Sequence, residues 1–194
     1  MSNPQWLWFI SRGSGLVLLV LFTAVMLLGT ATRLGWAPRR WPQFVTAELH
    51  RALSLFAVAL LALHVVTAIA DPYVSIGWAA TVLPFLSPYH AVAIGLGTLA
   101  VDLGAAVLLT SVLRHRLGFR SWRAVHWLAY LAWPAAFLHA LRAGGDLHTQ
   151  WVAAIAWGSA AATATAVAVR LAARARRAPV SRPGGRPGLR GARR

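Results

Sequence analysis

The chain of 194 residues contains no cysteine and no lysine, and only four of its residues are Asp or Glu. The lack of cysteine excludes disulfide bonds, thiolate-bound iron–sulfur clusters and the Cys-x-x-Cys-His attachment of c-type haem. Only 12% of the residues are charged, whereas 58% are hydrophobic, and the mean hydropathy is +0.60. A chain so poor in charge is too apolar for an ordinary soluble domain, and we expect a membrane protein.

Five apolar segments are each long enough to cross a hydrocarbon core of about 30 Å, which takes about 20 helical residues. They lie near residues 7–30, 47–70, 89–113, 122–142 and 150–172. The sequence therefore predicts an all-α integral membrane protein, built as a five-helix transmembrane bundle over residues 1–173. Residues 174–194 are rich in Arg, Pro and Gly and are expected to form a disordered, basic cytoplasmic tail. In the linker after the second segment we expect a short interfacial helix around Ile76–Leu86.

The positive charge of the chain, +15 overall, is unevenly distributed between the linkers. Arginines are concentrated in the first linker, the third linker and the tail, whereas the linkers at 71–88 and 143–149 contain none. Because basic residues collect on the cytoplasmic side of a membrane protein, we expect the N-terminus outside and the C-terminus in the cytoplasm. A strongly basic chain can also indicate nucleic acid as a partner. Here the location of the arginines between apolar segments argues against nucleic acid and for membrane lipid.

Two of the apolar segments each contain a pair of histidines, at spacings of 14 and 13 residues. His50 and His64 lie on the second segment, and His126 and His139 lie on the fourth. An ionisable or metal-binding side chain is costly inside lipid, so each intramembrane histidine needs a partner. In the expected topology the depths match as His50 with His126 and His64 with His139. Along a helix these spacings correspond to about 21 Å and about 19.5 Å, and the pattern indicates two haems stacked across a membrane.

The helical phase supports the first pair better than the second. At about 100° per residue, His50 and His64 lie about 40° from alignment and share a face, whereas His126 and His139 are about 140° apart. Pro134 lies between the second pair, and an interior proline kinks a helix, which would restore the register. Three further histidines are expected to be polar surface residues: His90, His115 and His148.

These residues resemble the ferric reductase-like transmembrane domain. That superfamily includes NADPH oxidases, yeast-type ferric reductases and the bacterial haem membrane subunits of methionine sulfoxide reductase systems. The resemblance rests on E-L-H-R-A-L-S…A-L-H around His50 and His64, and on W-R-A-V-H-W-L-A-Y…F-L-H around His126 and His139. The 14 and 13 spacings are its most specific part, and it covers residues 5–172. The resemblance implies two b-type haems, each with bis-histidine ligation.

The S-R-G-S-G segment resembles one whose arginine supports the outer haem, and here that residue is Arg12. The chain also departs from the family. Many relatives have six helices, whereas five are expected here. Oxygen-reducing oxidases resemble one another in a further histidine one turn after the outer ligand, where this chain has Ala68, which argues against superoxide production. No flavin- or nicotinamide-binding domain is expected in this chain, so a partner is needed to supply electrons.

Haem propionates need cationic partners, because a buried carboxylate is costly when it is unpaired. The candidates are Arg51, Arg120 and Arg123 at the inner level and Arg12 and Arg142 at the outer level. Except for Arg12, which lies deeper in its segment, each of these has the alternative of extending to lipid head groups. Asp102, near the middle of the third segment, is an intramembrane acid and hence a functional candidate. Its alternatives are a proton or quinol role, pairing with an arginine, or a neutral form bonded to a carbonyl.

The leading hypothesis is the haem-bearing membrane subunit of an oxidoreductase, which passes electrons through two b-type haems across a bacterial cytoplasmic membrane. The expected donor is a quinol or a separate cytoplasmic flavin reductase. The expected extracytoplasmic acceptor is ferric iron, an FMN-binding protein or a periplasmic-type reductase, with His148 as a candidate exit residue. Binding of FMN or quinone to this chain stays open. The alternatives are a histidine-based proton-relay or transport subunit, and a membrane anchor for a soluble partner, neither of which requires two histidine pairs at matched depth.

Overall fold

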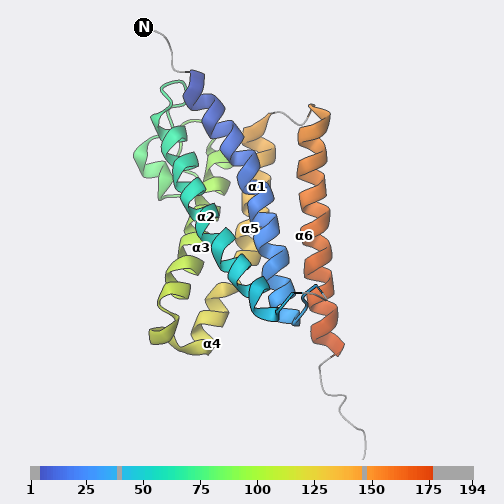
Figure 1. The fold of residues 1–194 in the computed structure, drawn as a ribbon. Coiled ribbons are helices and arrows are strands. Elements are labelled where there is room, and N and C mark those ends of the chain that lie inside the picture. Colours follow the sequence, from blue (N-terminus) through green and yellow to red (C-terminus); the bar gives the residue numbers. More distant parts are fainter. Residues whose placement is uncertain (1–4, 39–40, 146–147, 177–194) are drawn as a thin grey trace, which may run out of the picture.

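The computed structural model describes residues 5–38, 41–145 and 148–176, and every regular element in these residues is helical (Figure 1). The elements are α1 (Gln5–Leu34), α2 (Gln43–Ala70), η1 (Trp78–Thr81), α3 (Ala91–Val112), α4 (Arg114–His126), α5 (Ala129–Gly144) and α6 (Gln150–Arg176). The ends of the helices follow local chemistry. After α2, the carboxylate of Asp71 accepts a hydrogen bond from the Tyr73 N–H (3.0 Å) and Pro72 cannot continue the helix. After α5, Gly145 adopts a φ of 68°, which favours glycine.

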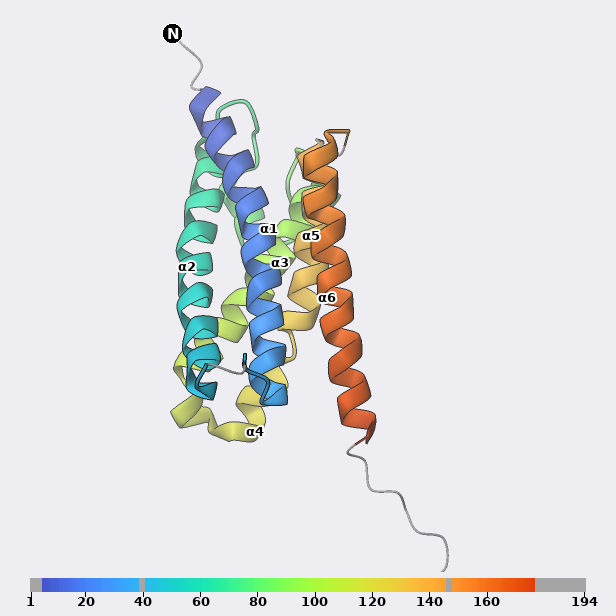
Figure 2. The same cartoon turned by 45° about the vertical axis from the view of Figure 1, so that its right-hand side comes forward.

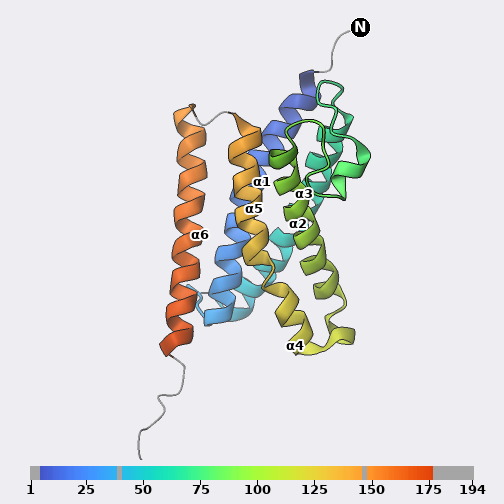
Figure 3. The same cartoon turned by 180° about the vertical axis from the view of Figure 1, so that it is seen from behind.

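Helix α1 lies at the centre of the arrangement and packs against α2, α5 and α6, while α3 packs against α5 (Figures 1 and 2). Seen from behind, α5 runs between α3 and α6, and α4 closes one end (Figure 3). The buried core cluster joins α1, α5 and α6 through Leu19, Trp133, Phe137 and Ala156. The Trp133 indole N–H donates to the Thr23 hydroxyl (3.2 Å), so this core also fixes α5 against α1.

Helices α1, α2, α3 and α6 are long and apolar enough to cross a membrane, and α4 with α5 passes the same test as one bent pair. The chain is therefore an all-helical, multi-pass membrane protein with four or five spans. Its outer surface is apolar, since Phe44, Leu109 and Val112 are each 60–68% exposed. A surface of this kind suits contact with lipid chains. Hydroxyl groups within the helices donate to carbonyls one turn back, as Thr110 does to Ala106 (2.7 Å), which satisfies them without water.

The fourth expected segment, 122–142, is a bent pair of helices rather than one continuous helix. Helices α4 and α5 meet at an angle of 43°, with Trp127 and Leu128 between them. Here the Leu128 N–H donates to the Val125 carbonyl (2.9 Å), three residues back, as in a 3₁₀ turn. The kink expected at Pro134 is therefore wrong in its place, because Pro134 lies inside α5. Pro134 has no N–H to offer the carbonyl of Tyr130, which weakens the start of α5 just after the bend.

The linker between α2 and α3 contains less helix than expected. The helix expected around Ile76–Leu86 is reduced to the 3₁₀ turn η1. The linker instead packs on α3, where the Thr98 hydroxyl donates to the Ala80 carbonyl (2.6 Å). Gly95 permits a close approach, since a Cβ at this position would lie 2.5 Å from the backbone nitrogen of Phe85. Contact with α3, rather than local helix formation, thus determines the course of this linker.

The two ends of the bundle differ in charge. We call the end formed by α4 and the C-terminal ends of α1 and α6 the basic end (lower end in Figure 1). It carries Arg33, Arg114, Arg116, Arg120, Arg123, Arg170, Arg174 and Arg176. The opposite end, with the start of α1 and the end of α5, carries Arg12 and Arg142. Helix α6 extends to Arg176, so the first three residues of the expected tail are helical, whereas 177–194, like Arg39 and Arg40, lies outside the described residues.

Candidate functional site

The four intramembrane histidines face one another in two pairs. His50 on α2 faces His126 at the end of α4, with ring centroids 6.5 Å apart and ring planes at 69°. His64 on α2 faces His139 on α5, with centroids 6.3 Å apart and planes at 84°. The fold thus brings together the side chains that were paired by depth in the sequence. The first pair lies toward the basic end, and the second lies about 21 Å further along α2.

Backbone carbonyls of neighbouring helices hold three of the four imidazoles. His50 Nδ1 lies 3.0 Å from the Val25 carbonyl oxygen on α1, and His139 Nδ1 lies 2.7 Å from that of Ala93 on α3. His64 Nδ1 lies 2.8 Å from the Ser11 carbonyl oxygen on α1. A carbonyl oxygen only accepts, so each of these Nδ1 atoms carries the hydrogen and donates it. Nε2 of each ring is then unprotonated, which is the form that binds a metal.

Each of these carbonyls is accessible because a glycine follows it one helical turn later. Gly15 comes four residues after Ser11, Gly29 four after Val25, and Gly97 four after Ala93. A Cβ would lie 3.0 Å from His64 Cε1 at Gly15 and 3.2 Å from His50 Cε1 at Gly29. At Gly97 it would lie 2.7 Å from His139 Nδ1. Any side chain at these positions would compete with an imidazole for the same space.

His126 lacks this support. Its Nδ1 is buried and has no hydrogen-bond partner among the described residues. On α3, the position 14 residues after Gly97 is Ser111, whose hydroxyl already donates to the Val107 carbonyl (2.7 Å). The Trp122 indole N–H donates in turn to the Ser111 hydroxyl (3.2 Å), and the Trp122 ring packs against His126 with centroids 5.1 Å apart. An aromatic contact therefore orients His126, whereas carbonyls orient the other three rings.

The bend between α4 and α5 accounts for the shared direction of His126 and His139. On a straight α-helix, these residues would point about 140° apart. A 3₁₀ turn has about 3.0 residues per turn, so each residue wound this way advances about 20° further than in an α-helix. The tightened turn at Trp127 and Leu128 advances the phase in the required direction, and the 43° bend re-aims α5. The register is thus restored at the helix junction.

The geometry suits a metal held by two axial imidazoles and a macrocycle. Two metal–nitrogen bonds of about 2 Å, plus the distance of each nitrogen from its ring centre, separate the centroids of such a pair by about 6.3 Å. The observed separations, 6.5 and 6.3 Å, agree with this value. No group of three or more His, Cys, Asp or Glu side chains in the described chain is placed to hold a metal ion. Two ligands per site leave the remaining positions to the four nitrogens of a porphyrin.

The S-R-G-S-G segment at the start of α1 contacts both α2 and α5. Arg12 Nη1 donates to the Ala143 carbonyl at the C-terminal end of α5 (3.0 Å), where the helix dipole favours a cation. Its guanidinium also lies over the Trp8 ring, 4.9 Å from the centroid. Ser14 Oγ donates to the Ser11 carbonyl and lies 3.2 Å from His64 Nδ1. The segment therefore orients His64 and ties α1 to the helix that carries His139.

The other arginines singled out in the sequence are exposed. Arg51, at the start of α2, and Arg120, in α4, both extend outward. Arg142 lines a pocket of about 290 Å³ with His90 and the first turn of α3, at the end of the bundle that holds the His64 pair. Arg123 lies over the Phe119 ring, 5.4 Å from the centroid, and lines a pocket at the basic end. None of them is in contact with a histidine of the two pairs in these interactions.

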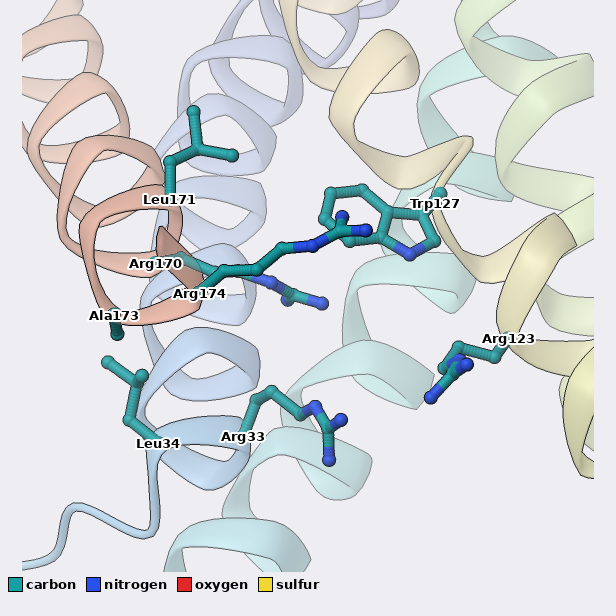
Figure 4. A pocket seen from close by; sticks show the side chains of 8 residues that line it. All are labelled: Arg33, Leu34, Arg123, Trp127, Arg170, Leu171, Ala173 and Arg174. Carbon is teal, nitrogen blue, oxygen red and sulfur yellow. The ribbon is translucent and has the colours of Figure 1, made fainter. Parts of the chain in front are cut away.

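The pocket at the basic end has a volume of about 240 Å³ and lies between α1, α4 and α6 (Figure 4). Four arginines line it: Arg33, Arg123, Arg170 and Arg174. Sequence reasoning counted these residues as topology signals, except for Arg123, and missed their convergence. It also missed Ser11, Ser14 and the three glycines, although one signal was present. Gly15 and Gly29 are 14 residues apart on α1, the same spacing as the histidines on the antiparallel helix α2.

The remaining candidates lie apart from the histidine pairs. Asp102 on α3 is partly exposed and makes no hydrogen bond or ion pair with another described residue, so the expected arginine or carbonyl partner is not found. His90 precedes α3 with a φ of 42° and packs against the Tyr89 ring. His115 and His148 are exposed. These three histidines are surface residues, as expected.

Fold and site together define a helical membrane protein with two pairs of facing intramembrane histidines. In a comparison with family models, residues 14–137 match the ferric reductase like transmembrane component, which is more than half of the chain, and the chain belongs to this family. Comparisons with curated proteins and with solved structures each gave no match. The matched range includes His50, His64 and His126, and Arg12 and His139 lie just outside it. Family membership implies transmembrane electron transfer in general, and the family typically binds haem.

Proposed function

We propose that the chain binds two b-type haems and transfers electrons through them from one membrane face to the other. His50 and His126 would ligate the inner haem iron, and His64 and His139 the outer one. The observation that carries the proposal is the pair of facing imidazoles repeated at two depths of one bundle, with centroids 6.5 and 6.3 Å apart. Membership of the ferric reductase-like family supports it independently of this geometry.

The residues around the histidines have definite tasks in this function. When bound, each haem supplies a carrier that accepts and returns one electron. Carbonyls of Ser11, Val25 and Ala93 hold three imidazoles in the tautomer that leaves Nε2 free, and they raise the basicity of these ligands. Gly15 and its counterparts leave space for the rings. The protein thus contributes ligation, orientation and spacing.

The propionate groups require cationic partners. Arg12 and Arg142 would serve the outer haem, and Arg51 and Arg123 the inner one. Arg12 has the strongest support, because its contact with Ala143 keeps the guanidinium between α1 and α5, near the end of the helix that carries His139. Arg51, Arg123 and Arg142 are exposed and can reach either a propionate or lipid head groups.

The proposed direction of the bundle follows from its charge. The basic end would lie in the cytoplasm and the N-terminus outside, in a bacterial cytoplasmic membrane, because basic residues favour the cytoplasmic side. The domain at residues 1–173 would then take electrons from a quinol or a cytoplasmic flavin reductase near His126. It would pass them outward to ferric iron, an FMN-binding protein or a periplasmic-type reductase near His139. The haem-bearing membrane subunit of an oxidoreductase is the role that these properties describe.

A reduced-minus-oxidised absorption spectrum of the purified protein, with haem quantified per chain, tests the proposal. We expect two b-type haems in the wild type, and one in His64→Ala and in His139→Ala. His115→Ala, which removes an exposed histidine of α4, is the control and should retain two. A folded protein that contains no haem after expression with haem supplied would overturn the proposal. A single haem in the wild type would show that one of the pairs is wrongly assigned.

A further inference from the structure

The pocket at the basic end concentrates positive charge without a matching acid. Its lining contains four arginines and no Asp or Glu. Figure 4 shows the side chains of Arg33, Arg123, Arg170 and Arg174 reaching from three helices, α1, α4 and α6, toward one shared space. The whole chain has only four acidic residues, and no described one of them forms an ion pair with these arginines. Such a cluster attracts an anion from outside the chain.

One arginine of the cluster is held in place before any ligand arrives. The Arg170 guanidinium lies over the Trp127 ring, 4.5 Å from its centroid, and over the Tyr130 ring at 5.0 Å. Its Nη1 donates to the Tyr130 hydroxyl. Arg174 lies over the same Trp127 ring, at 6.0 Å. These contacts leave other N–H groups of both guanidinium groups available, and guanidinium groups form paired hydrogen bonds with phosphate oxygens.

The size and position of the pocket indicate what kind of anion it accepts. Its volume of about 240 Å³ is below the range of roughly 300–1,000 Å³ that is typical of pockets for whole cofactors, so a head group fits it better than a flavin. Arg33, Arg123 and Arg174 are exposed, and the pocket is therefore accessible from the side of the bundle. Leu34 and Leu171 also line it, and Leu171 is 51% exposed on the outer surface of α6. A ligand with a phosphate and apolar chains satisfies both parts.

We propose that this pocket binds the phosphate group of one anionic phospholipid, with its acyl chains lying along the apolar surface of α1 and α6. Basic pockets between transmembrane helices are suited to such head groups. The bound lipid would join the C-terminal ends of α1 and α6 to Trp127, at the bend that orients His126. This site does not depend on haem binding, because its lining includes none of the paired histidines.

Native mass spectrometry of the purified protein, titrated with phosphatidylglycerol, measures this binding directly. We expect one phosphatidylglycerol to be retained in preference to phosphatidylcholine. The double variant Arg33→Gln/Arg174→Gln should reduce the affinity for phosphatidylglycerol about tenfold or more. Arg116→Gln/Arg120→Gln, which removes the same charge from exposed positions of α4 outside the pocket, should leave it nearly unchanged. The charge-conserving variant Arg33→Lys/Arg174→Lys should retain most of the binding and shows that the positions tolerate substitution.

Three results would overturn the proposal. Equal losses in the pocket variant and in the α4 variant would mean that the general charge of this end, not the pocket, attracts the lipid. Displacement of phosphatidylglycerol by millimolar inorganic phosphate would identify a site for free phosphate. A fall in haem content with unchanged lipid binding would assign the arginines to haem propionates. Haem content that is the same in all variants, with lipid lost only from the pocket variant, is the supporting result and leaves the haem proposal to its own test.

Discussion

Replacement of Gly97 by alanine examines the link between the glycines and the histidines most sharply. The added Cβ would lie 2.7 Å from His139 Nδ1 and 2.9 Å from its Cε1. Ordinary contact begins at 3.4 Å, so the ring or helix α3 must move by about 0.7 Å. The same Nδ1 donates to the Ala93 carbonyl, one turn before Gly97 on the same helix. The ring therefore cannot move away from the new methyl group without lengthening this hydrogen bond.

The expected magnitude follows from the tolerance of metal ligation. Metal–nitrogen distances vary by only about 0.2 Å, so a displacement of about 0.7 Å is too large for an unchanged bond. Overpacking costs about 1–3 kcal/mol, whereas alanine in place of glycine in a helix gains about 0.5–1 kcal/mol. We expect Gly97→Ala to destabilise the protein by about 1 kcal/mol and to lose most of the outer haem. The inner haem should stay bound.

Haem content per chain and a redox titration measure these effects. Gly158→Ala on α6 is the control, because Gly158 is exposed and its Cβ would meet no atom within 4 Å. We expect a graded series in which Gly97→Ala is most severe, followed by Gly15→Ala (3.0 Å) and Gly29→Ala (3.2 Å), the last acting on the inner haem. If Gly97→Ala kept two haems with unchanged midpoint potentials, the proposed packing of His139 against α3 would be refuted.

Two further predictions concern the outer arginine and the asymmetry of the sites. Arg12→Ala removes the hydrogen bond to the Ala143 carbonyl and should lower the free energy of unfolding by about 1 kcal/mol and weaken retention of the outer haem. Thermal denaturation and haem content during gel filtration measure this, and the same haem content as in wild type would count against a role for Arg12. Of the two haems, we expect the one at His50 and His126 to have the higher midpoint potential, because only one of its ligands has an Nδ1–H bonded to a carbonyl. A redox titration of His64→Ala, which should retain this haem alone, assigns the transition. A potential lower than that of the outer haem would contradict the argument.

The number of helices and the depth of the histidines could be predicted from the sequence. A hydrocarbon core requires runs of about 20 apolar residues, and such runs are visible without tertiary information. All five expected segments correspond to helices, although their bounds differ by several residues and the fourth is bent. Depth follows from a count of residues along a helix, so the pairing of His50 with His126 and of His64 with His139 was available from spacing alone.

Direction and contact required the structure. The phase of His126 relative to His139 depends on a 3₁₀ turn at Trp127 and Leu128, which is formed by three consecutive local hydrogen bonds and by packing, not by Pro134 alone. Hydrogen bonds between α1 and the histidines of α2 join residues 25 to 53 positions apart. Which carbonyl a ring meets depends on how the helices rotate against one another, and hydrophobic periodicity does not specify this within one residue.

The sequence by itself thus determined a membrane bundle with histidines at two levels, because burial in lipid restricts length, polarity and charge so strongly. Only the tertiary structure decided that glycines of α1 and α3 admit those histidines to backbone carbonyls and that His126 lacks such a partner. It also decided that four arginines from three helices converge on one pocket. These features arise where separate helices meet, and the contacts between them depend on packing geometry that a single chain segment does not contain.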